Sequence, residues 1–292
     1  MTVGPSTSTA VTSTGHAFSD TSWLDQHFQS ARAEYEDGLR WVGIQRGWTI
    51  LDAGCGGGGF VQLISEQVGS VGAVYALDLA PENVAQVEAL AAKGSFPSPV
   101  HGKVGSVLSL PFADATFDCV WSANVAQYLT ELEFERSIAE CKRVLKPGGI
   151  VAIKDQDASI FQIIPIDADV LSRLWQARRV AAYDGVPGPW TGTLGPWSAA
   201  SIPKRLRKSG LTVIRRKSWL VERWAPVESS TRSLVEDALK RWAKFADESN
   251  LPEADKQVWR AVGATPENVL NDPDFCFREA FVVAIGQVPK VE

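Results

Sequence analysis

The sequence predicts an α/β fold in which helices cover both faces of a mostly parallel sheet. Strand-like and helix-like segments alternate five times between residues 49 and 155, with short connections, and this alternation is typical of parallel sheets. A run of four glycines, Gly56 to Gly59, follows the first of these strands. Acidic or polar residues end the strands, and parallel sheets bind their ligands beyond those ends. A binding site is therefore expected at one edge of the sheet.

The glycine run belongs to residues 49–60, TILDAGCGGGGF. Ile50 and Leu51 are expected to end a buried strand, residues 52–59 to form a turn, and residues 60–68 to form a helix. Glycine permits positive φ and lets a ligand approach the backbone closely. A tight corner without any ligand is the alternative, because a glycine-rich turn taken alone is weak evidence for a nucleotide.

A second signal lies at the end of the next strand. Residues 73–77 are expected to form this strand, which Asp78 ends, and Pro81 suits the first turn of a helix that runs to about Lys93. An acid in this place can accept hydrogen bonds from the two hydroxyls of a ribose. Two features at matched strand ends favour a nucleotide-like ligand over an empty corner.

The remaining strands of this half follow the same pattern. They are expected at residues 99–104, 117–122 and 150–154. A helix is expected between the last two, over residues 131–144, and a Lys-Pro-Gly-Gly stop signal follows it. Ser106, Asn124 and Asp155 fall at or near the three strand ends.

Five segments, taken in order, resemble the class I S-adenosylmethionine-dependent methyltransferases: LDAGCGGGG, YALDLA, GSVLSLPF, FDCVWSANVAQYL and RVLKPGGIVAI. The resemblance covers about residues 35–155. It implies a Rossmann-like sheet of seven strands with the last one antiparallel, and S-adenosylmethionine as the cofactor, which leaves as S-adenosylhomocysteine. The strands that complete such a sheet are expected at residues 211–221 and 275–285.

The resemblance also implies a set of cofactor-binding residues: Tyr35, Asp52, Gly54, Cys55, Gly56, Asp78, Leu79, Ser106, Val107, Asn124 and Gln127. Within this set Asp52 would frame the methionine part, Asp78 would hold the ribose and Leu79 would lie against the adenine. Ser106 departs from the family pattern, which usually has an acid at this point, near the adenine amino group. A hydroxyl can still form a hydrogen bond with the base edge.

Two other functions remain open on the residues alone. Gly54, Gly56 and Gly59 also fit the spacing of a dinucleotide-binding turn, so an NAD-dependent dehydrogenase is the first alternative. The LPF and KPGG segments favour the methyltransferase over it. The second alternative is a non-catalytic partner subunit that binds S-adenosylmethionine.

The expected organisation has five parts: a disordered tail over residues 1–17, an amino-terminal helical lid over 18–45, the cofactor-binding core over 46–155, a substrate-binding insertion or lid over 156–200, and the completion of the sheet over 201–292 with a helical insertion at 225–270. The tail is rich in Ser and Thr. Substrate specificity is expected in the parts that follow the core.

The chain has 11 Trp and a single Met, and Trp supplies large, rigid apolar surface. Five residues are expected to wall an apolar substrate chamber together with Tyr35: His27, Trp175, Tyr183, Trp190 and Trp197. Simple packing of the insertion is the equally weighted alternative. The expected acceptor is a small, apolar, aromatic or heteroaromatic natural product, for instance an indole, methylated at C, N or O.

Several side chains could take a proton from the acceptor during transfer. The candidate bases are His27, Tyr35, Asp155, Asp157 and Tyr183. No catalytic metal is expected, because the four cysteines are far apart and no metal-binding spacing occurs. Free thiols are the favoured state of these cysteines.

Charge and composition limit the partners. The formal net charge is −5 and the pI about 5.4, which argues against nucleic acid as a partner. Seven basic residues nevertheless cluster in the sequence: Lys204, Arg205, Arg207, Lys208, Arg215, Arg216 and Lys217. They are interpreted as a solvated face, and contact with an anionic substrate group is the less favoured alternative. A small-molecule substrate, no membrane partner, a cytoplasmic location and a monomer or homodimer are expected.

Overall fold

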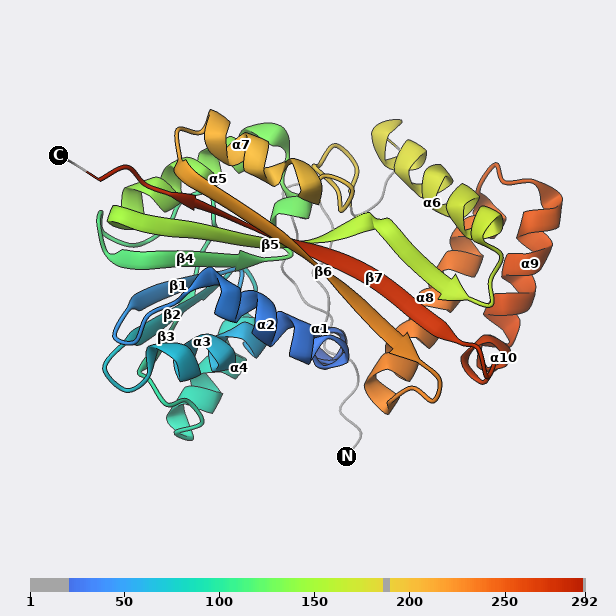
Figure 1. Cartoon of the computed structure of the whole chain (residues 1–292), viewed down its shortest axis with the longest axis horizontal. Coiled ribbons are helices and arrows are strands. Elements are labelled where there is room, and N and C mark those ends of the chain that lie inside the picture. The colour runs from blue at the N-terminus through green and yellow to red at the C-terminus, as the bar shows by residue number, and fades with distance from the viewer. Residues whose placement is uncertain (1–20, 186–189, 291–292) are drawn as a thin grey trace.

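The computed structural model describes residues 21–185 and 190–290, so the expected tail over residues 1–17 lies outside it. Seven strands form one sheet in the order β3-β2-β1-β4-β5-β7-β6 (Figure 1). Their bounds are β1 Thr49–Ala53, β2 Ala73–Asp78, β3 Val100–Val104, β4 Phe117–Ala123, β5 Leu145–Ile164, β6 Thr212–Trp224 and β7 Cys276–Gln287. The first five strands pair in parallel, and β7 is antiparallel to both of its neighbours. The predicted seven-stranded α/β fold is confirmed.

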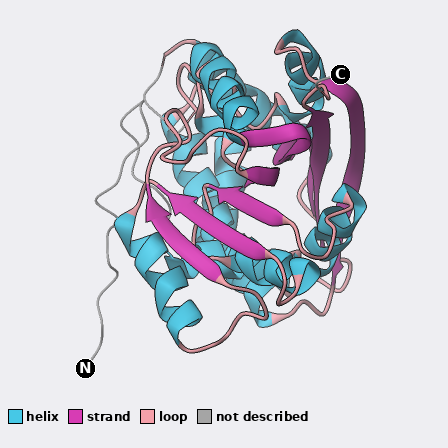
Figure 2. Ribbon diagram, turned by 90° about the vertical axis from the view of Figure 1, so that its left-hand side faces the viewer, coloured by secondary structure: helices cyan, strands magenta, loops and turns pink. Residues whose placement is uncertain are grey.

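Helices lie on both sides of the sheet (Figure 2). Their bounds are α1 Thr21–Ser30, α2 Arg32–Val42, α3 Gly59–Val68, α4 Pro81–Ala92, α5 Glu131–Val144, α6 Ala168–Tyr183, α7 Ile202–Lys208, α8 Ser229–Glu248, α9 Glu253–Ala264 and α10 Pro266–Leu270, with short 3-10 turns η1 Ala126–Tyr128 and η2 Ala199–Ser201. One buried apolar cluster joins α1 to α4 to one face of the sheet, and a second joins α5 and α7 to the other face.

Local sequence accounts for where several helices begin. The Thr130 side chain accepts a hydrogen bond from the backbone N–H of Glu133, whose carboxylate accepts one from the backbone N–H of Thr130, at the start of α5. This reciprocal pair satisfies donors that a helix start would otherwise leave unpaired. Asp167 caps α6 in a similar way, and Pro81 occupies the first turn of α4 as the sequence predicts.

The fifth strand differs from its prediction. It was expected to end at Asp155, but β5 continues to Ile164 with an irregularity between Gln156 and Phe161. The polar run that follows Ile153 is typical of a loop, yet Lys154 and Asp155 are each only 1% exposed. Residues 154–156 pair with β7, and the pairing resumes at Phe161, so the strand persists where side-chain polarity predicts its end.

The long strands β5, β6 and β7 extend from the core of the sheet toward a separate group of helices (Figure 1). A third apolar cluster joins the far ends of β5 and β7 to α6, α8, α9 and α10. We call these four helices the cap. The cap is held to the sheet by continuous strands, so its position relative to the core is fixed by strand pairing.

Two helices, α1 and α2, lie in the segment where an amino-terminal helical lid is predicted, residues 18–45. The Arg223 guanidinium of β6 pairs with the Glu34 carboxylate at 2.6 Å, and Trp219 Nε1 donates a hydrogen bond to the Asp37 carboxylate at 2.6 Å. These contacts fasten α2 to the edge strand. Among the described residues, no helix is long and apolar enough to span a bilayer.

Candidate cofactor and acceptor site

The glycine turn between β1 and α3 depends on the absence of side chains. Gly54, Gly56 and Gly58 all have positive φ, and a Cβ atom at Gly54 would collide with Val125. A Cβ atom at Gly59 would lie 2.7 Å from the ring of Phe28. Larger residues would therefore strain the backbone or displace neighbouring side chains.

Asp78, at the end of β2, connects this turn to the next one. Its carboxylate accepts hydrogen bonds from the backbone N–H of Gly56 (2.8 Å), the backbone N–H of Ala80 (2.9 Å) and the side-chain amide of Asn83 (3.2 Å). The side chain is only 6% exposed. One carboxylate thus orders two neighbouring loops at the carboxyl edge of the sheet.

A cavity of about 1080 Å³ begins at the glycine turn and ends among aromatic side chains of the cap. Ten of the eleven predicted cofactor residues line it: Tyr35, Gly54, Cys55, Gly56, Asp78, Leu79, Ser106, Val107, Asn124 and Gln127. Small-molecule sites commonly measure about 300–1,000 Å³. The cavity is therefore large enough to hold a cofactor and a second small molecule together.

Asp52, the eleventh of these residues, does not line the cavity. Its side chain is buried, and neither carboxylate oxygen has a hydrogen-bond partner in the described part of the chain. Burial, together with the nearby Asp78 carboxylate, raises the pKa of Asp52 to about 8. A cationic ligand group in the neighbouring cavity would favour the ionised form of this carboxyl group, so Asp52 fits a site for a positively charged ligand.

The sequence of this region is similar to those of known proteins. Residues 51–153 match the family model of a methyltransferase domain. A protein of Aspergillus luteorubrus named "Probable methyltransferase ltbC" is 29% identical over 256 residues, which are 82% of each chain. The 2-phytyl-1,4-naphtoquinone methyltransferase of Trichormus variabilis is 34% identical over 133 residues, which cover 45% of this chain and 55% of that protein. The match to this second relative therefore spans about half of its length.

A solved structure shares the fold. The YcgJ protein of Bacillus subtilis aligns with a TM-score of 0.54 at 17% identity, over 88% of this chain and all of that one. The residues that match the methyltransferase family, 51–153, contain both the glycine turn and Asp78 at the end of β2. The core of this chain is a class I S-adenosylmethionine-dependent methyltransferase domain. Its cofactor is S-adenosylmethionine, and the positive sulfonium and ammonium groups of that molecule suit a site that is lined by Asp78 and has the Asp52 carboxyl group buried nearby.

Behind the cavity wall, in contact with two residues that line it, the methyltransferase has a buried lysine that the sequence did not reveal. Lys154 Nζ donates a hydrogen bond to Asn124 Oδ1 at 2.8 Å and lies 4.3 Å from the centre of the Tyr35 ring. Asn124 has a φ of 58°, and its backbone N–H donates to the Lys154 carbonyl at 2.8 Å. Lys154 thus fixes two predicted cofactor residues. The sequence pattern predicts only that Lys154 is the last residue of a strand.

Two predicted bases of the methyltransferase reach the cavity. His27 lines it, but burial and the positive charge of Lys154 lower the pKa of this imidazole to about 3. Tyr35 also lines it, and burial followed by the charge of Glu279 raises the pKa of its hydroxyl. Both side chains are therefore neutral near pH 7, His27 as a weak base and Tyr35 as a hydrogen-bond donor.

Other predicted site residues lie elsewhere. Tyr183 is 69% exposed, because it ends α6 on the solvent side, and it does not line the cavity. Asp155 and Asp157 are buried and do not line it, since alternate side chains of a strand point to opposite faces. Trp197 packs against Trp190 with ring centres 5.4 Å apart and supports the wall without reaching the cavity. Residues 186–189 of the predicted loop lie outside the described residues.

The sequence missed Glu279. This β7 residue lines the cavity, is 4% exposed and accepts a hydrogen bond from Gln156 Nε2 at 2.8 Å. Burial raises the pKa of its carboxyl group. An acid within an apolar strand was the available signal, but Glu279 is too far along the chain from the glycine turn for its spacing to carry information.

The sequence also missed one face of α8. Its lining residues recur with helical spacing: Leu234, Val235, Asp237, Ala238, Arg241, Trp242 and Phe245. The amphipathic pattern predicts a helix here, but not what the apolar face covers. Of the predicted aromatic walls, Trp175 and Trp190 line the cavity, and Phe161 and Trp242 join them.

The basic cluster lies away from this cavity. Arg205 pairs with Glu131, Lys208 with Glu135 and Lys217 with Asp37, and no member of the cluster lines the cavity. These ion pairs favour the interpretation as a solvated face. Among the described residues, no group of three or more His, Cys, Asp or Glu side chains could hold a metal ion, and all four cysteines are free and buried.

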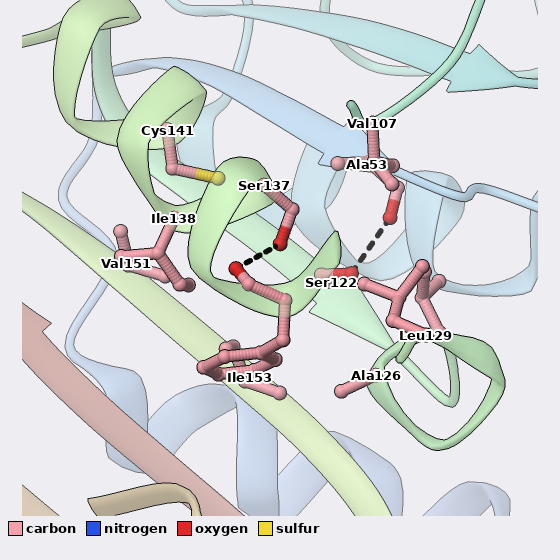
Figure 3. Close-up of a pocket in the computed structure, with 12 residues that line it drawn as sticks. Ala53, Val107, Ser122, Ala126, Leu129, Ser137, Ile138, Cys141, Val151 and Ile153 are labelled. Atoms are coloured by element: carbon pink, nitrogen blue, oxygen red, sulfur yellow. Dashed lines mark hydrogen bonds between the residues drawn. The ribbon is translucent and has the colours of Figure 1, made fainter. Parts of the chain in front are cut away.

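A second, much smaller cavity of about 20 Å³ lies between the sheet and α5 (Figure 3). Its wall is almost entirely apolar. Ser122 Oγ donates a hydrogen bond to the Ala53 carbonyl at 2.8 Å, and Ser137 Oγ donates one to the Phe134 carbonyl at 2.8 Å. With its hydroxyl groups already engaged, this void is a packing defect behind the cofactor site.

Proposed function

We propose that this methyltransferase transfers a methyl group to a small, largely apolar, aromatic or heteroaromatic natural product at a C, N or O atom. The continuity of the cavity carries the proposal. A single space connects the glycine turn with aromatic walls that include Phe161, Trp175, Trp190 and Trp242. Flat aromatic acceptors suit walls of this kind, and an indole-type ring is one candidate among them.

The named relatives support the same class of substrate. The Trichormus variabilis relative is named for a naphthoquinone, which is a flat, apolar ring system. Because that match covers about half of the relative, it supports a chemical class and no particular acceptor. The continuous aromatic wall is the independent support from this chain.

The bound cofactor would supply an electrophilic methyl group on its sulfonium. The protein then has to hold the acceptor atom in line with that methyl group and to exclude water. His27 and Phe28 of α1 line the cavity beside the glycine turn, and the cap closes the opposite end. Side chains from distant segments thus surround the space between the two ligands.

We assign the proton-accepting role to Glu279. Its carboxylate lines the cavity, and burial raises its pKa toward the range in which a carboxylate is an effective base. His27 is the alternative within reach, but its lowered pKa makes it a poor acceptor of a proton. Gln156 holds one oxygen of Glu279 and orients the carboxylate.

The test is a screen of aromatic acceptors with S-adenosylmethionine, in which methylated product and S-adenosylhomocysteine are both measured. A productive acceptor supports the proposal, whereas tight cofactor binding with no product from any acceptor would favour the non-catalytic partner subunit. With the productive acceptor, Glu279→Gln should reduce kcat at least about hundredfold and leave S-adenosylhomocysteine affinity unchanged.

Glu222→Gln is the matched control for that variant. Glu222 lies on the neighbouring strand β6, pairs with Arg278 and does not line the cavity. An equal loss of kcat in both variants, or no loss in Glu279→Gln, would remove Glu279 as the base. His27→Asn would then be the variant to measure.

A further inference from the structure

The cap end of the cavity contains an arginine enclosed by aromatic rings. Arg178 of α6 lines the cavity, and its guanidinium carbon lies close to four ring centres: Trp175 at 4.6 Å, Trp190 at 5.0 Å, Trp242 at 5.8 Å and Phe245 at 6.0 Å. The rings favour a cation electrostatically. They accept no conventional hydrogen bond in the plane of the guanidinium, where its five N–H donors point.

Arg178 has no counter-charge in the described part of the chain. Its Nη1 atom is buried and has no hydrogen-bond partner there, and no carboxylate lies within ion-pair distance. Asp237 lines the same cavity but is exposed and forms no such pair. Burial, followed by the positive charge of Arg241, a second cation on the lining, lowers the pKa of Arg178 to about 10. The surroundings of Arg178 therefore have an excess of positive charge, and the Nη1 group has a hydrogen-bond donor without an acceptor.

We propose that Arg178 binds a carboxylate carried by the aromatic acceptor. A carboxylate would satisfy the unpaired Nη1 donor and would neutralise the charge in a place where water is scarce. The flanking rings of Trp175 and Trp190 would contact the flat body of the same molecule. This inference rests on the proposed function, since it assumes that the acceptor occupies the space beside the cofactor.

A carboxylate fits better than a phosphate. Only one Arg178 nitrogen is both buried and unpaired, and the centres of four aromatic rings lie 4.6–6.0 Å from the guanidinium carbon. A carboxylate has two oxygens in one plane and needs few donors, whereas a phosphate presents its oxygens in three directions and needs more donors. The site would thus select flat aromatic acids.

The test is calorimetric titration of the full chain, loaded with S-adenosylhomocysteine, with matched pairs of probes. The probes are indole-3-acetate against indole-3-acetamide, and benzoate against benzamide, with phenyl phosphate as a third anion. Wild type should bind each acid at least about tenfold more tightly than its amide, as expected for a charge-assisted hydrogen bond. Arg178→Met should lose this preference, and Arg178→Lys should retain part of it.

Arg179→Met is the control. Arg179 is adjacent on α6, is exposed, lies 5.9 Å from the Tyr183 ring and does not line the cavity, so its replacement should leave the acid preference intact. Equal binding of acids and amides to wild type would overturn the carboxylate site. It would not contradict the proposal that the cavity binds apolar aromatic acceptors.

Tighter binding of phenyl phosphate, lost in Arg178→Met, would also overturn the assignment to carboxylate. Failure of every aromatic probe to bind to protein that does bind S-adenosylhomocysteine would contradict both this inference and the proposed acceptor class. The cofactor titration in the same experiment shows whether the first site is intact. Arg178→Lys keeps the positive charge and covers the case in which Arg178→Met fails to fold.

Discussion

At the residue scale, Asp78 combines two tasks that are hard to separate. Its carboxylate already accepts hydrogen bonds from Gly56, Ala80 and Asn83, and it also lines the cavity. Each carboxylate oxygen can accept more than one hydrogen bond, so a ribose hydroxyl can be added without breaking this network. The loop order and the ribose contact therefore depend on the same charge.

Asp78→Ala should weaken S-adenosylhomocysteine binding at least tenfold, because a hydrogen bond to a charged acceptor contributes about 1.5–3 kcal/mol. Isothermal calorimetry measures the change. Asp118→Asn is the control, since Asp118 accepts from the backbone of Thr49 and pairs with Lys146 at the opposite end of the strands. Unchanged affinity in Asp78→Ala would exclude a ribose contact at this residue.

Asp52 gives a prediction about pH. Its pKa is 3.8 in an ordinary setting and about 8 in the fold, so between these values the folded chain binds more protons than the unfolded chain. Stability from this group is therefore fully present below about pH 4 and is lost as the pH rises toward 8. Without cofactor, the stability advantage of Asp52→Asn over wild type should therefore grow from pH 5 to pH 9, by about 2–4 °C in Tm for each kcal/mol.

Thermal unfolding at pH 5, 7 and 9 checks this difference. Asp155 and Glu279 also have raised pKa values, caused first by burial, and they add to the same trend in both proteins. The difference between variant and wild type isolates Asp52. Parallel Tm curves over the whole range would contradict a raised pKa at this carboxyl group.

At the element scale, the strands of the core follow from the sequence because each has a compact apolar run with a turn signal after it. Residues 73–77 and 117–122 are examples, and β2 and β4 extend each of them by one residue. The second half of β5 could not be predicted in this way. Asp155 is buried and it pairs with β7, more than 100 residues later in the chain, and local pattern carries no information about such a partner.

The loop before α7 shows how an irregular element is tied to the cofactor site. Its backbone donates hydrogen bonds from Leu194 to the Leu129 carbonyl at 2.8 Å and from Gly195 to the Gln127 carbonyl at 3.0 Å. Trp190, at the start of this loop, lines the cavity. Trp190, on the acceptor side of the cavity, and Gln127, a predicted cofactor residue, are thus connected through a few backbone hydrogen bonds.

Gly195→Ala should loosen this connection. Gly195 has a φ of 65°, and a Cβ atom there would lie 3.0 Å from the Trp197 ring. We expect a destabilisation of about 1 kcal/mol or more and a several-fold rise in the acceptor KM, with cofactor affinity unchanged. Gly192→Ala is a matched control, since its φ is 70° and a Cβ atom would meet nothing within 4 Å. An equal acceptor KM in both variants would show that backbone strain alone, and not the contact with Trp197, causes the change.

At the scale of the whole molecule, the site is assembled from three regions that are distant in sequence. The core supplies the glycine turn and Asp78, α1 supplies His27 and Phe28, and the cap supplies Arg178 and one face of α8. Motif spacing predicts the first region because its glycines and Asp78 lie within about 25 residues of one another, at the ends of two adjacent strands. The other two depend on tertiary packing against β6 and β7, which a single sequence does not encode in its local pattern.

Side-chain contacts attach α2 and the end of α1 to strand β6, beside the site. Arg223 Nη1 and Nη2 bind the two oxygens of Glu34 at 2.8 and 2.6 Å, and Arg223 Nε donates to the Ser30 carbonyl at 2.7 Å. Both side chains of the ion pair are less than 25% exposed. A bidentate, partly buried pair stabilises more than an exposed one.

Arg223→Met should therefore free α1 and α2 while the core stays folded. Hydrogen exchange measured by mass spectrometry should become faster in peptides from α1 and α2 and stay unchanged in β1 and β2. Cofactor should protect these helices in wild type, because His27, Phe28 and Tyr35 line its cavity, and should protect them less in the variant. Arg260→Met, which removes exposed pairs with Asp247 and Glu253 in the cap, is the control. Equal protection of α1 and α2 by cofactor in Arg223→Met and wild type would mean that packing on the sheet, and not this ion pair, holds the helices over the site.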